Sequence, residues 1–308
     1  MQALVFDKNV YYTNNYPKPI PQQNESLVRI LMAAICNTDR EVIKGYRPRF
    51  KGVLGHEFVG VVEASPDESL VGRRVVGELN AGCKTCIYCT TGREHHCVNR
   101  KVLGMEGKDG SFAEYMTIAT DLLHPVPDSL STGQAIFCEP LAAALEVVEQ
   151  SHLRPSQEVA LIGDGRLAYM IGQVVALRGT PLMVFGRNAK KLAMFEPFAR
   201  TSMTPQGSFE TVIEASGSPA GLETAISLTR SMGLIIVKST FAEMAALNTS
   251  ELVVREITLR GSRCGPFVPA LNLLNRGLVK LPPIDLYSLA EYQEAFASRA
   301  FKSGFNFQ

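Results

Sequence analysis

The 308-residue chain is long enough for two domains, and its 46% hydrophobic and 20% charged residues are typical of a globular protein with buried cores. Its formal net charge of +1 argues against binding of nucleic acid or of a membrane surface by bulk electrostatics. The first residues lack a secretory signal and no apolar run is long enough to span a membrane, so we expect a cytoplasmic protein without membrane contact.

The first 125 residues predict a β-rich domain. Short β-prone segments are bounded by Pro, Gly, Asn and Asp, at residues 3–6, 26–35, 56–64 and 73–78. The pattern changes near residue 133, because the apolar residues of 133–150 recur three and four positions apart. This spacing predicts a helix.

Strands and helices alternate from residue 158 onwards. We predict strands at residues 158–163, 181–186, 209–216 and 233–240. We predict the helices between them at residues 166–179, 188–200 and 218–230. Such alternation is typical of a doubly wound parallel sheet with helices on both faces. A helix at 269–277 precedes a segment without this pattern, so we expect the chain to return to its first domain there.

The loop between the first strand and the first helix of this α/β region predicts a dinucleotide site. It contains Gly163-x-Gly165-x-x-Ala168, in which the first glycine would make a tight turn and the second would let the backbone approach a pyrophosphate. The phosphates would bind at the start of the helix, so the expected contacts are Gly163, Asp164, Gly165, Arg166 and Leu167. An ordinary strand–turn–helix connection is the alternative.

The end of the second strand favours NADP over NAD. An acid there would accept from the 2′-hydroxyl of the adenosine ribose, but the sequence is Gly186-Arg187-Asn188, and the Arg187 fork matches a 2′-phosphate. The alternative is that Arg187 is a solvated charge and that both cofactors bind. Two later strand ends carry the residues expected beside the nicotinamide half, which could also be ordinary turn residues: Ala215, Ser216 and Ser239.

Residues 81–97 hold a cluster of four cysteines, which are Cys83, Cys86, Cys89 and Cys97. Four thiolates so close in sequence can surround one tetrahedral zinc ion with no open position, which is typical of a structural site. Disulfides are the less favoured interpretation, because the loops would be tight and we expect a reducing compartment. We treat the neighbouring His95 and His96 as surface residues.

Three further candidates lie far apart in the sequence. Cys36, the pair His56-Glu57, and Glu139 offer sulfur, nitrogen and oxygen ligands that suit a zinc ion with an open coordination position. Taken singly, each has a simpler interpretation as a buried thiol or a core residue. Their spacing alone cannot assemble them.

Seven motifs, taken in order along the chain, resemble the zinc-dependent medium-chain dehydrogenase/reductase (alcohol dehydrogenase) family. They are ICNTD, GHEFVG, CxxCxxC-x7-C, GSFAEY, EPLAAAL, GDGRLA and VIEASGSP. Within the family the chain looks most like the polyol, glucose and threonine dehydrogenase branch. The resemblance implies an α/β fold in which a GroES-like β-rich catalytic domain is interrupted by an inserted Rossmann-type domain. The implied boundaries are residues 1–140 with a structural zinc lobe at 81–97, then 141–264, then 265–308.

The resemblance also implies roles for individual residues. Cys36 and His56 match zinc ligands, and Glu57 matches an acid that either ligates the metal or supports it. Glu139 matches a further ligand or a residue holding a metal-bound water, with Cys138 a less favoured substitute. Thr38 matches the hydroxyl that passes on the substrate proton. Asp39 matches the acid that orients the histidine ligand.

The implied activity is reversible hydride transfer between a nicotinamide cofactor and a secondary alcohol, polyol or sugar hydroxyl, in a homodimer or homotetramer. Two departures from the family stand out. Arg40-Glu41-Val42 stands where other alcohol dehydrogenases continue the proton relay with a histidine, and only residues 201–208 link the second helix of the inserted domain to its next strand. These departures keep a second hypothesis open, a non-catalytic zinc- and dinucleotide-binding sensor. A nucleic-acid-binding zinc module and a zinc-free reductase are disfavoured.

Overall fold

The computed structural model describes residues 1–240 and 244–307, which form two compact units. Unit 1 contains Met1–Glu139 and Phe267–Gln308, and unit 2 contains Pro140–Pro266. No helix among the described residues is long and apolar enough to cross a membrane. The mixed α/β architecture confirms the predicted fold class.

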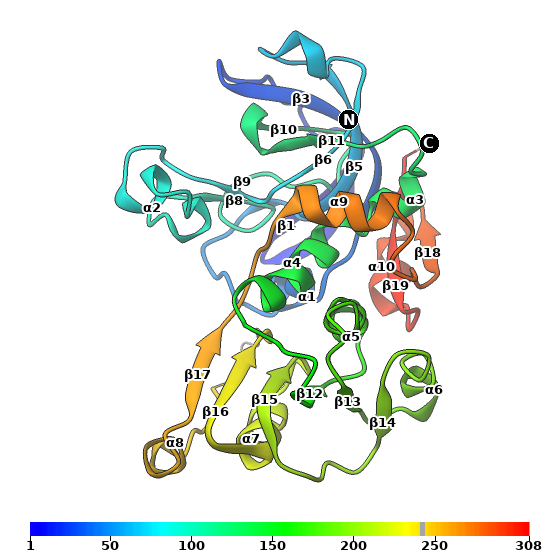
Figure 1. Ribbon diagram of the computed structural model, residues 1–308. Coiled ribbons are helices and arrows are strands. Elements are labelled where there is room, and N and C mark those ends of the chain that lie inside the picture. Colours follow the sequence, from blue (N-terminus) through cyan, green and yellow to red (C-terminus); the bar gives the residue numbers. More distant parts are fainter. Residues whose placement is uncertain (241–243, 308) are drawn as a thin grey trace. The chain divides into compact units, whose positions relative to one another are not determined.

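Unit 1 is built mainly from antiparallel strands (Figure 1). Its largest sheet has the order β11-β6-β5-β3-β19-β18, with β10 also pairing with β3, and two three-stranded sheets have the orders β2-β1-β4 and β7-β8-β9. The strands are β1 (Ala3–Asp7), β2 (Asn9–Thr13), β3 (Glu25–Ala34), β4 (Gly52–Val53), β5 (Glu57–Ala64), β6 (Arg74–Gly77), β7 (Asn80–Ala81), β8 (Lys101–Leu103), β9 (Gly107–Lys108), β10 (Tyr115–Ala119), β11 (Leu123–Pro125), β18 (Ile284–Tyr287) and β19 (Lys302–Asn306).

Short helices connect these strands. They are α1 (Asn37–Ile43), α2 (Ile87–Thr90), α3 (Thr132–Ala135), α9 (Phe267–Asn275) and α10 (Tyr292–Ala297), with 3-10 turns η1 (Glu68–Leu70), η2 (Glu94–His96), η3 (Thr120–Leu122) and η4 (Leu289–Glu291). The last strand β19 pairs antiparallel with β3, so the end of the chain completes the sheet that its beginning starts.

Unit 2 contains a six-stranded sheet in which every neighbouring pair is parallel (Figure 1). The order β14-β13-β12-β15-β16-β17 reverses direction between β12 and β15, which is the topological switch point of a doubly wound fold. Its elements, with α4 shared at its start with unit 1, are α4 (Cys138–Glu149), β12 (Val159–Ile162), α5 (Arg166–Ala176), β13 (Leu182–Phe185), α6 (Ala189–Leu192), β14 (Arg200–Ser202), β15 (Phe209–Glu214), α7 (Pro219–Leu228), β16 (Thr229–Val237), α8 (Thr249–Val254) and β17 (Thr258–Gly261).

Helix α7 covers one face of this sheet. Ala160 and Ile162 of β12 lie on that face and belong to the core beneath the helix. Side chains alternate between the faces of a strand, which is why these two residues share a face. Leu222 and Ile226 of α7, together with Phe209 of β15, complete that core. Helix α5 packs against β12 and β13, and its Tyr169 contacts the ring of Phe195 edge-on at 5.4 Å between centroids.

Three predicted elements differ from the structure. The helix predicted at 188–200 is only one turn, α6, and the turns after it place the buried Phe195 and the half-buried Phe198 against Gly172. The helix predicted at 133–150 is two helices, α3 and α4. Strand β16 begins at Thr229 instead of residue 233, because Thr229 pairs with Phe209 directly after α7 ends.

The connection from β14 to β15 is unusually short. As expected from residues 201–208, the third strand is reduced to three residues, and residues 203–208 contain no helix. Residues 203–208 form an exposed loop that bends at residues 203, 204 and 207 and runs from the edge strand β14 to β15, three strands away.

Candidate functional site

The start of α1 places Cys36 and Thr38 in unit 1. Cys36 caps the helix, and its backbone N–H donates to Oδ2 of Asp39 over 2.8 Å. This capping bond fixes Asp39 in a fully buried position, with its other oxygen 3.2 Å from Nδ1 of His56. The Thr38 hydroxyl lies 3.6 Å from the Cys36 sulfur.

His56 and Glu57 reach the same place from the start of β5. Gly55 before them has a φ of +95°, and a Cβ there would lie 2.3 Å from the ring of Phe112, so only glycine fits this turn. The potential ligand atoms of Cys36, His56 and Glu57 all lie within 4.8 Å of one another. Sulfur, imidazole and carboxylate are a donor set that fits zinc.

Asp39 controls the ionisation of His56. Burial alone would lower the pKa of His56, but the charge of Asp39, with a contribution from Cys36, raises it well above its usual range. Because Asp39 faces Nδ1, Nε2 is the nitrogen left for a metal.

Sequence analysis did not identify Lys302, the first residue of β19. Its ammonium forms a buried ion pair with Oε2 of Glu57, 245 residues away in the sequence. Strand β19 pairs with β3, and β3 pairs with β5, which brings the two side chains together. In the sequence, Lys302 stands out only as a lysine within the phenylalanine-rich segment FKSGFNF, residues 301–307.

Glu139 is not part of this group of three, which is the only catalytic-type ligand cluster found among the described residues. It lies in the first turn of α4, next to the fully buried Cys138. Burial raises the pKa of Cys138 well above its usual range, and the charges of Glu139 and Glu78 raise it further. Like Glu139, Cys138 lies outside the group of three potential ligands.

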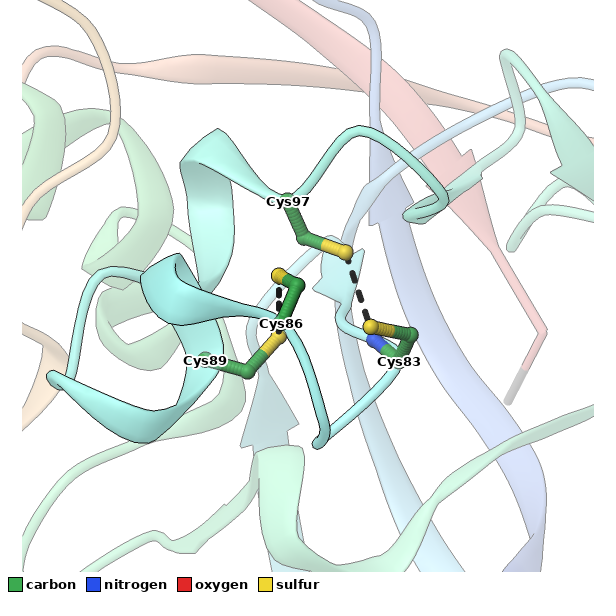
Figure 2. Close-up of side chains that lie close together, drawn as sticks. All are labelled: Cys83, Cys86, Cys89 and Cys97. Atoms are coloured by element: carbon green, nitrogen blue, oxygen red, sulfur yellow. Dashed lines mark hydrogen bonds between the residues drawn. The ribbon is translucent and has the colours of Figure 1, made fainter.

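The four-cysteine lobe forms a second cluster (Figure 2). Its sulfurs point toward one another within 4.8 Å, with 3.6 Å between Cys86 and Cys89. A tetrahedral zinc with Zn–S bonds of about 2.3 Å places its sulfurs about 3.8 Å apart, so the lobe fits the ion. All four cysteines are free thiols, as the metal interpretation requires.

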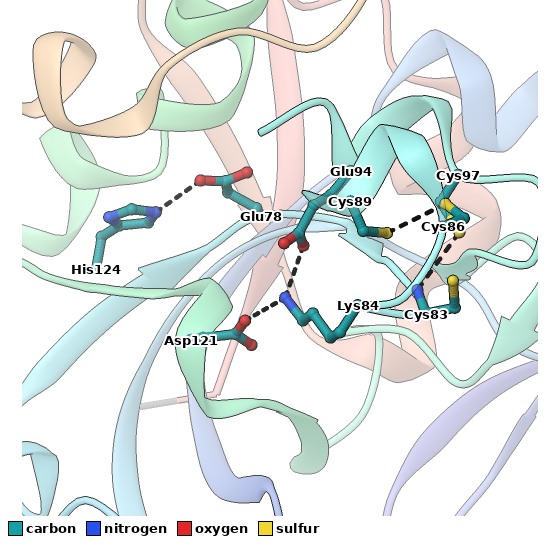
Figure 3. Close-up of polar contacts among 9 residues, drawn as sticks. All are labelled: Glu78, Cys83, Lys84, Cys86, Cys89, Glu94, Cys97, Asp121 and His124. Atoms are coloured by element: carbon teal, nitrogen blue, oxygen red, sulfur yellow. Dashed lines mark hydrogen bonds and ion pairs between the residues drawn. The ribbon is translucent and has the colours of Figure 1, made fainter. Parts of the chain in front are cut away.

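Charged side chains tie this lobe to the rest of unit 1 (Figure 3). Lys84, which lies in the lobe with a φ of +64°, pairs with Glu94 at 2.6 Å and with Asp121 of η3. Nearby, Nε2 of His124 contacts Glu78 at 2.9 Å. Lys84 thus links the lobe to a segment outside it, which holds the loop in place.

The glycine-rich loop of unit 2 joins β12 to α5. Gly163 has a φ of +127°, and a Cβ there would lie 2.5 Å from the carbonyl oxygen of Ala215. A Cβ on Gly165 would meet nothing within 4 Å, so the backbone there is open to an approaching phosphate. Arg166 and Leu167 are half-buried in the first turn of α5. The loop fits a dinucleotide.

The remaining predicted cofactor residues lie at the carboxyl ends of the other strands. Gly186, Arg187 and Asn188 follow β13, and the exposed Asn188 caps α6 by accepting from the Lys191 N–H at 3.2 Å. Ser216 donates to Glu214 at 2.6 Å, and Ser239 accepts from the Gly217 N–H at 2.7 Å. The ends of β15 and β16 are therefore tied together where the nicotinamide half is expected.

The chain belongs to the medium-chain dehydrogenase/reductase family, of which it carries the alcohol dehydrogenase GroES-like domain at residues 22–128. A D-arabitol-phosphate dehydrogenase of Enterococcus avium is 30% identical over 96% of this chain and 92% of its own length. A sorbitol dehydrogenase of Halalkalibacterium halodurans is 27% identical over 99% and 97%. The fold is shared with the solved L-idonate 5-dehydrogenase of Escherichia coli, with a TM-score of 0.88, 25% identity and coverage of 99% and 98%.

Proposed function

We propose that the chain is a zinc- and nicotinamide-dependent oxidoreductase that transfers a hydride between the cofactor and a secondary alcohol, polyol or sugar hydroxyl. The observation that carries the proposal is the convergence of Cys36, His56 and Glu57 within 4.8 Å, with Asp39 at the imidazole. Relatives named as sorbitol and D-arabitol-phosphate dehydrogenases support the polyol class of substrate.

Cys36, His56 and Glu57 would hold the catalytic zinc, and we keep Glu139 as a further ligand or as the residue that holds a water there. When bound, zinc supplies Lewis acidity that lowers the pKa of a hydroxyl group. Cys83, Cys86, Cys89 and Cys97 would hold the structural zinc. Lys302 neutralises Glu57, which controls how much charge that carboxylate offers to the metal.

Thr38 is the residue proposed to receive the substrate proton, because its hydroxyl lies beside the Cys36 sulfur. The relay does not continue through Arg40, whose guanidinium donates to the Phe296 carbonyl oxygen and stacks on that ring. A guanidinium does not release its proton in proteins, so the proton must leave Thr38 by another path.

The nicotinamide cofactor supplies the hydride chemistry. The chain would bind it through the 163–167 loop and the strand ends at 186–188, 215–216 and 239. We propose a preference for NADP, carried by the Arg187 side chain. We also propose that units 1 and 2 are the catalytic and dinucleotide-binding domains, and that the protein is a cytoplasmic homodimer or homotetramer.

A substrate screen tests the proposal directly. Alcohols, polyols and aldoses are each incubated with NAD+ and with NADP+, and nicotinamide absorbance is followed. Turnover of a polyol or secondary alcohol that Cys36→Ser abolishes is the expected result. Cofactor binding without turnover of any alcohol would instead support the non-catalytic sensor.

A further inference from the structure

One carboxylate connects the glycine-rich loop to the end of the second strand. Oδ2 of Asp164 accepts a hydrogen bond from the Arg187 backbone N–H at 2.7 Å and another from the Asn188 N–H at 2.8 Å. Asp164 lies between Gly163 and Gly165, so the proposed pyrophosphate loop and the proposed ribose loop are one bonded assembly.

The packing at Gly186 shows how close this contact is. A Cβ on residue 186 would lie 2.7 Å from Cβ of Asp164 and 2.8 Å from its Oδ2. Real Cβ atoms do not approach so closely, so a larger residue at 186 would push the two loops apart. The contact between the two loops at Asp164 therefore requires glycine at position 186.

This bonding changes what the strand end can offer to a cofactor. In a doubly wound sheet, the end of the second strand meets the adenosine ribose. Here the N–H groups of Arg187 and Asn188 are already bonded, so discrimination at the ribose 2′ position falls to the Arg187 side chain. The direction of that side chain depends on its backbone, which Asp164 holds.

We propose that Asp164 is a positioning residue for cofactor selection, which fixes the turn that presents Arg187 to the 2′-phosphate. The inference rests on the proposed function, specifically on its NADP preference. The Asp164 carboxylate also opposes the 2′-phosphate by its own charge. Asp164 thus has two separable effects, a bonded one that favours the phosphate and an electrostatic one that disfavours it.

Calorimetric titration with two cofactor fragments, adenosine 2′,5′-bisphosphate and 5′-AMP, measures the selection without turnover. In the wild type the bisphosphate should bind more tightly, and Arg187→Ala should reduce this preference by about tenfold, as expected for loss of a charged hydrogen bond. Asp164→Ala should show a smaller preference than Asp164→Asn, because both variants lack the charge and only asparagine can keep the two hydrogen bonds. In the Arg187→Ala background these two variants should differ little. Such non-additivity is the signature of two residues acting as one unit.

Asp164→Asn is the matched control, because its amide oxygen can still accept both N–H groups while the charge is gone. It should keep or increase the preference for the bisphosphate, so a decrease would overturn the proposal even if Asp164→Ala proved unstable. Equal preferences in Asp164→Ala and Asp164→Asn, or a difference between them that persists in the Arg187→Ala background, would also overturn it.

The outcomes separate this inference from the proposed function. Failure of both fragments to bind the wild type would remove the dinucleotide site itself. Equal binding of the two fragments would leave the dinucleotide site but remove the NADP preference, and the role of Asp164 with it. A preference that depends on Arg187 but not on Asp164 would leave the proposed function intact and remove only the inference.

Discussion

At the scale of single residues, the ion pair between Glu57 and Lys302 is the most consequential feature that sequence analysis did not find. Both side chains are buried, and neither could be accommodated alone without a large desolvation cost. The pair places a carboxylate against the proposed metal ligands Cys36 and His56 and balances its charge. It therefore contributes to both stability and the site.

We predict that Lys302→Met destabilises unit 1 of the metal-free protein by about 3–5 kcal/mol, because it leaves the Glu57 charge buried without a partner. Hydrogen-exchange protection of the β5 and β19 amides measures this local loss. The matched control is Lys51→Met, which breaks the exposed pair with Asp7 at 2.9 Å and should cost less than about 1 kcal/mol. Glu57→Gln combined with Lys302→Met should recover part of the stability, and equal effects of the two lysine variants would contradict the prediction.

The cysteines of the lobe should differ in reactivity once metal is removed. Hydrogen bonds from the Thr85 side chain and from the backbone of Thr85 and Cys86 lower the pKa of Cys83 to about 6. Burial raises the pKa of Cys89 to about 12. A lowered pKa means that Cys83 is a thiolate above about pH 6, whereas Cys89 remains a thiol at neutral pH.

We therefore predict that iodoacetamide modifies Cys83 before Cys89 in chelator-treated protein, with a Cys83 rate that rises through about pH 6 and levels off above about pH 7. Peptide mass spectrometry after timed labelling provides the measurement. Added zinc should protect both residues. Equal labelling of the two cysteines, or a Cys83 rate that still climbs at pH 9, would show that the lobe does not hold this geometry without metal.

At the scale of elements, Phe209 is important because residues 203–208 provide no helix between β14 and β15. Its ring packs edge-on against Phe185 of β13, with 5.9 Å between centroids, and it belongs to the core beneath α7. A buried aromatic residue at the start of β15 thus anchors a strand that follows a short, exposed loop.

Phe209→Ala is expected to lower the free energy of unfolding of unit 2 by about 3–5 kcal/mol, through lost burial and the cavity that remains. Met203→Ala, in the same connection but 56% exposed, should change it by less than about 0.5 kcal/mol. Denaturant titration monitored by hydrogen exchange in β15 compares the two variants. A small effect of Phe209→Ala would mean that other side chains anchor the strand.

Elements with a clear apolar pattern could be predicted from sequence, and polar ones could not. The continuous apolar run within residues 158–163 became β12, and Gly163 with Gly165 marked its loop correctly as a turn with positive φ and an open backbone. Strand β14 has three polar or charged residues, Arg200–Ser202, whose pairing with β13 is visible only in the assembled sheet. Lys302 was missed for a similar reason, since its partner is set by sheet order and not by sequence distance.

At the scale of the whole molecule, the structure separates two ligand clusters with different proposed roles. The four cysteines of the lobe face one another within one short segment of the chain. Cys36 instead lies between β3 and α1, whereas His56 and Glu57 lie at the start of β5. Family membership and the ligand motifs could be inferred from sequence because residue types within each motif are local. Sequence alone could not show whether Glu139 joins the proposed catalytic zinc ligands, because that depends on the position of the first turn of α4.

Metal analysis of two cysteine variants tests this division. The wild type should hold two zinc ions per chain, and each variant should hold one. Cys36→Ser should abolish turnover with little change in Tm. Cys83→Ser should lower Tm by about 10 °C. Loss of a structural metal costs several kcal/mol of stability, and each kcal/mol lost lowers Tm by roughly 2–4 °C. Loss of catalysis without loss of stability in Cys83→Ser would reverse the assignment.

The connection between β14 and β15 also indicates where the length of the chain can change. Residues 203–208 are exposed and form no helix. Lengthening such a surface loop costs only fractions of a kcal/mol to about 1 kcal/mol. A protein engineer could therefore insert a helix or a peptide tag here and leave the pairing of β14 with β13 and the core around Phe209 unchanged.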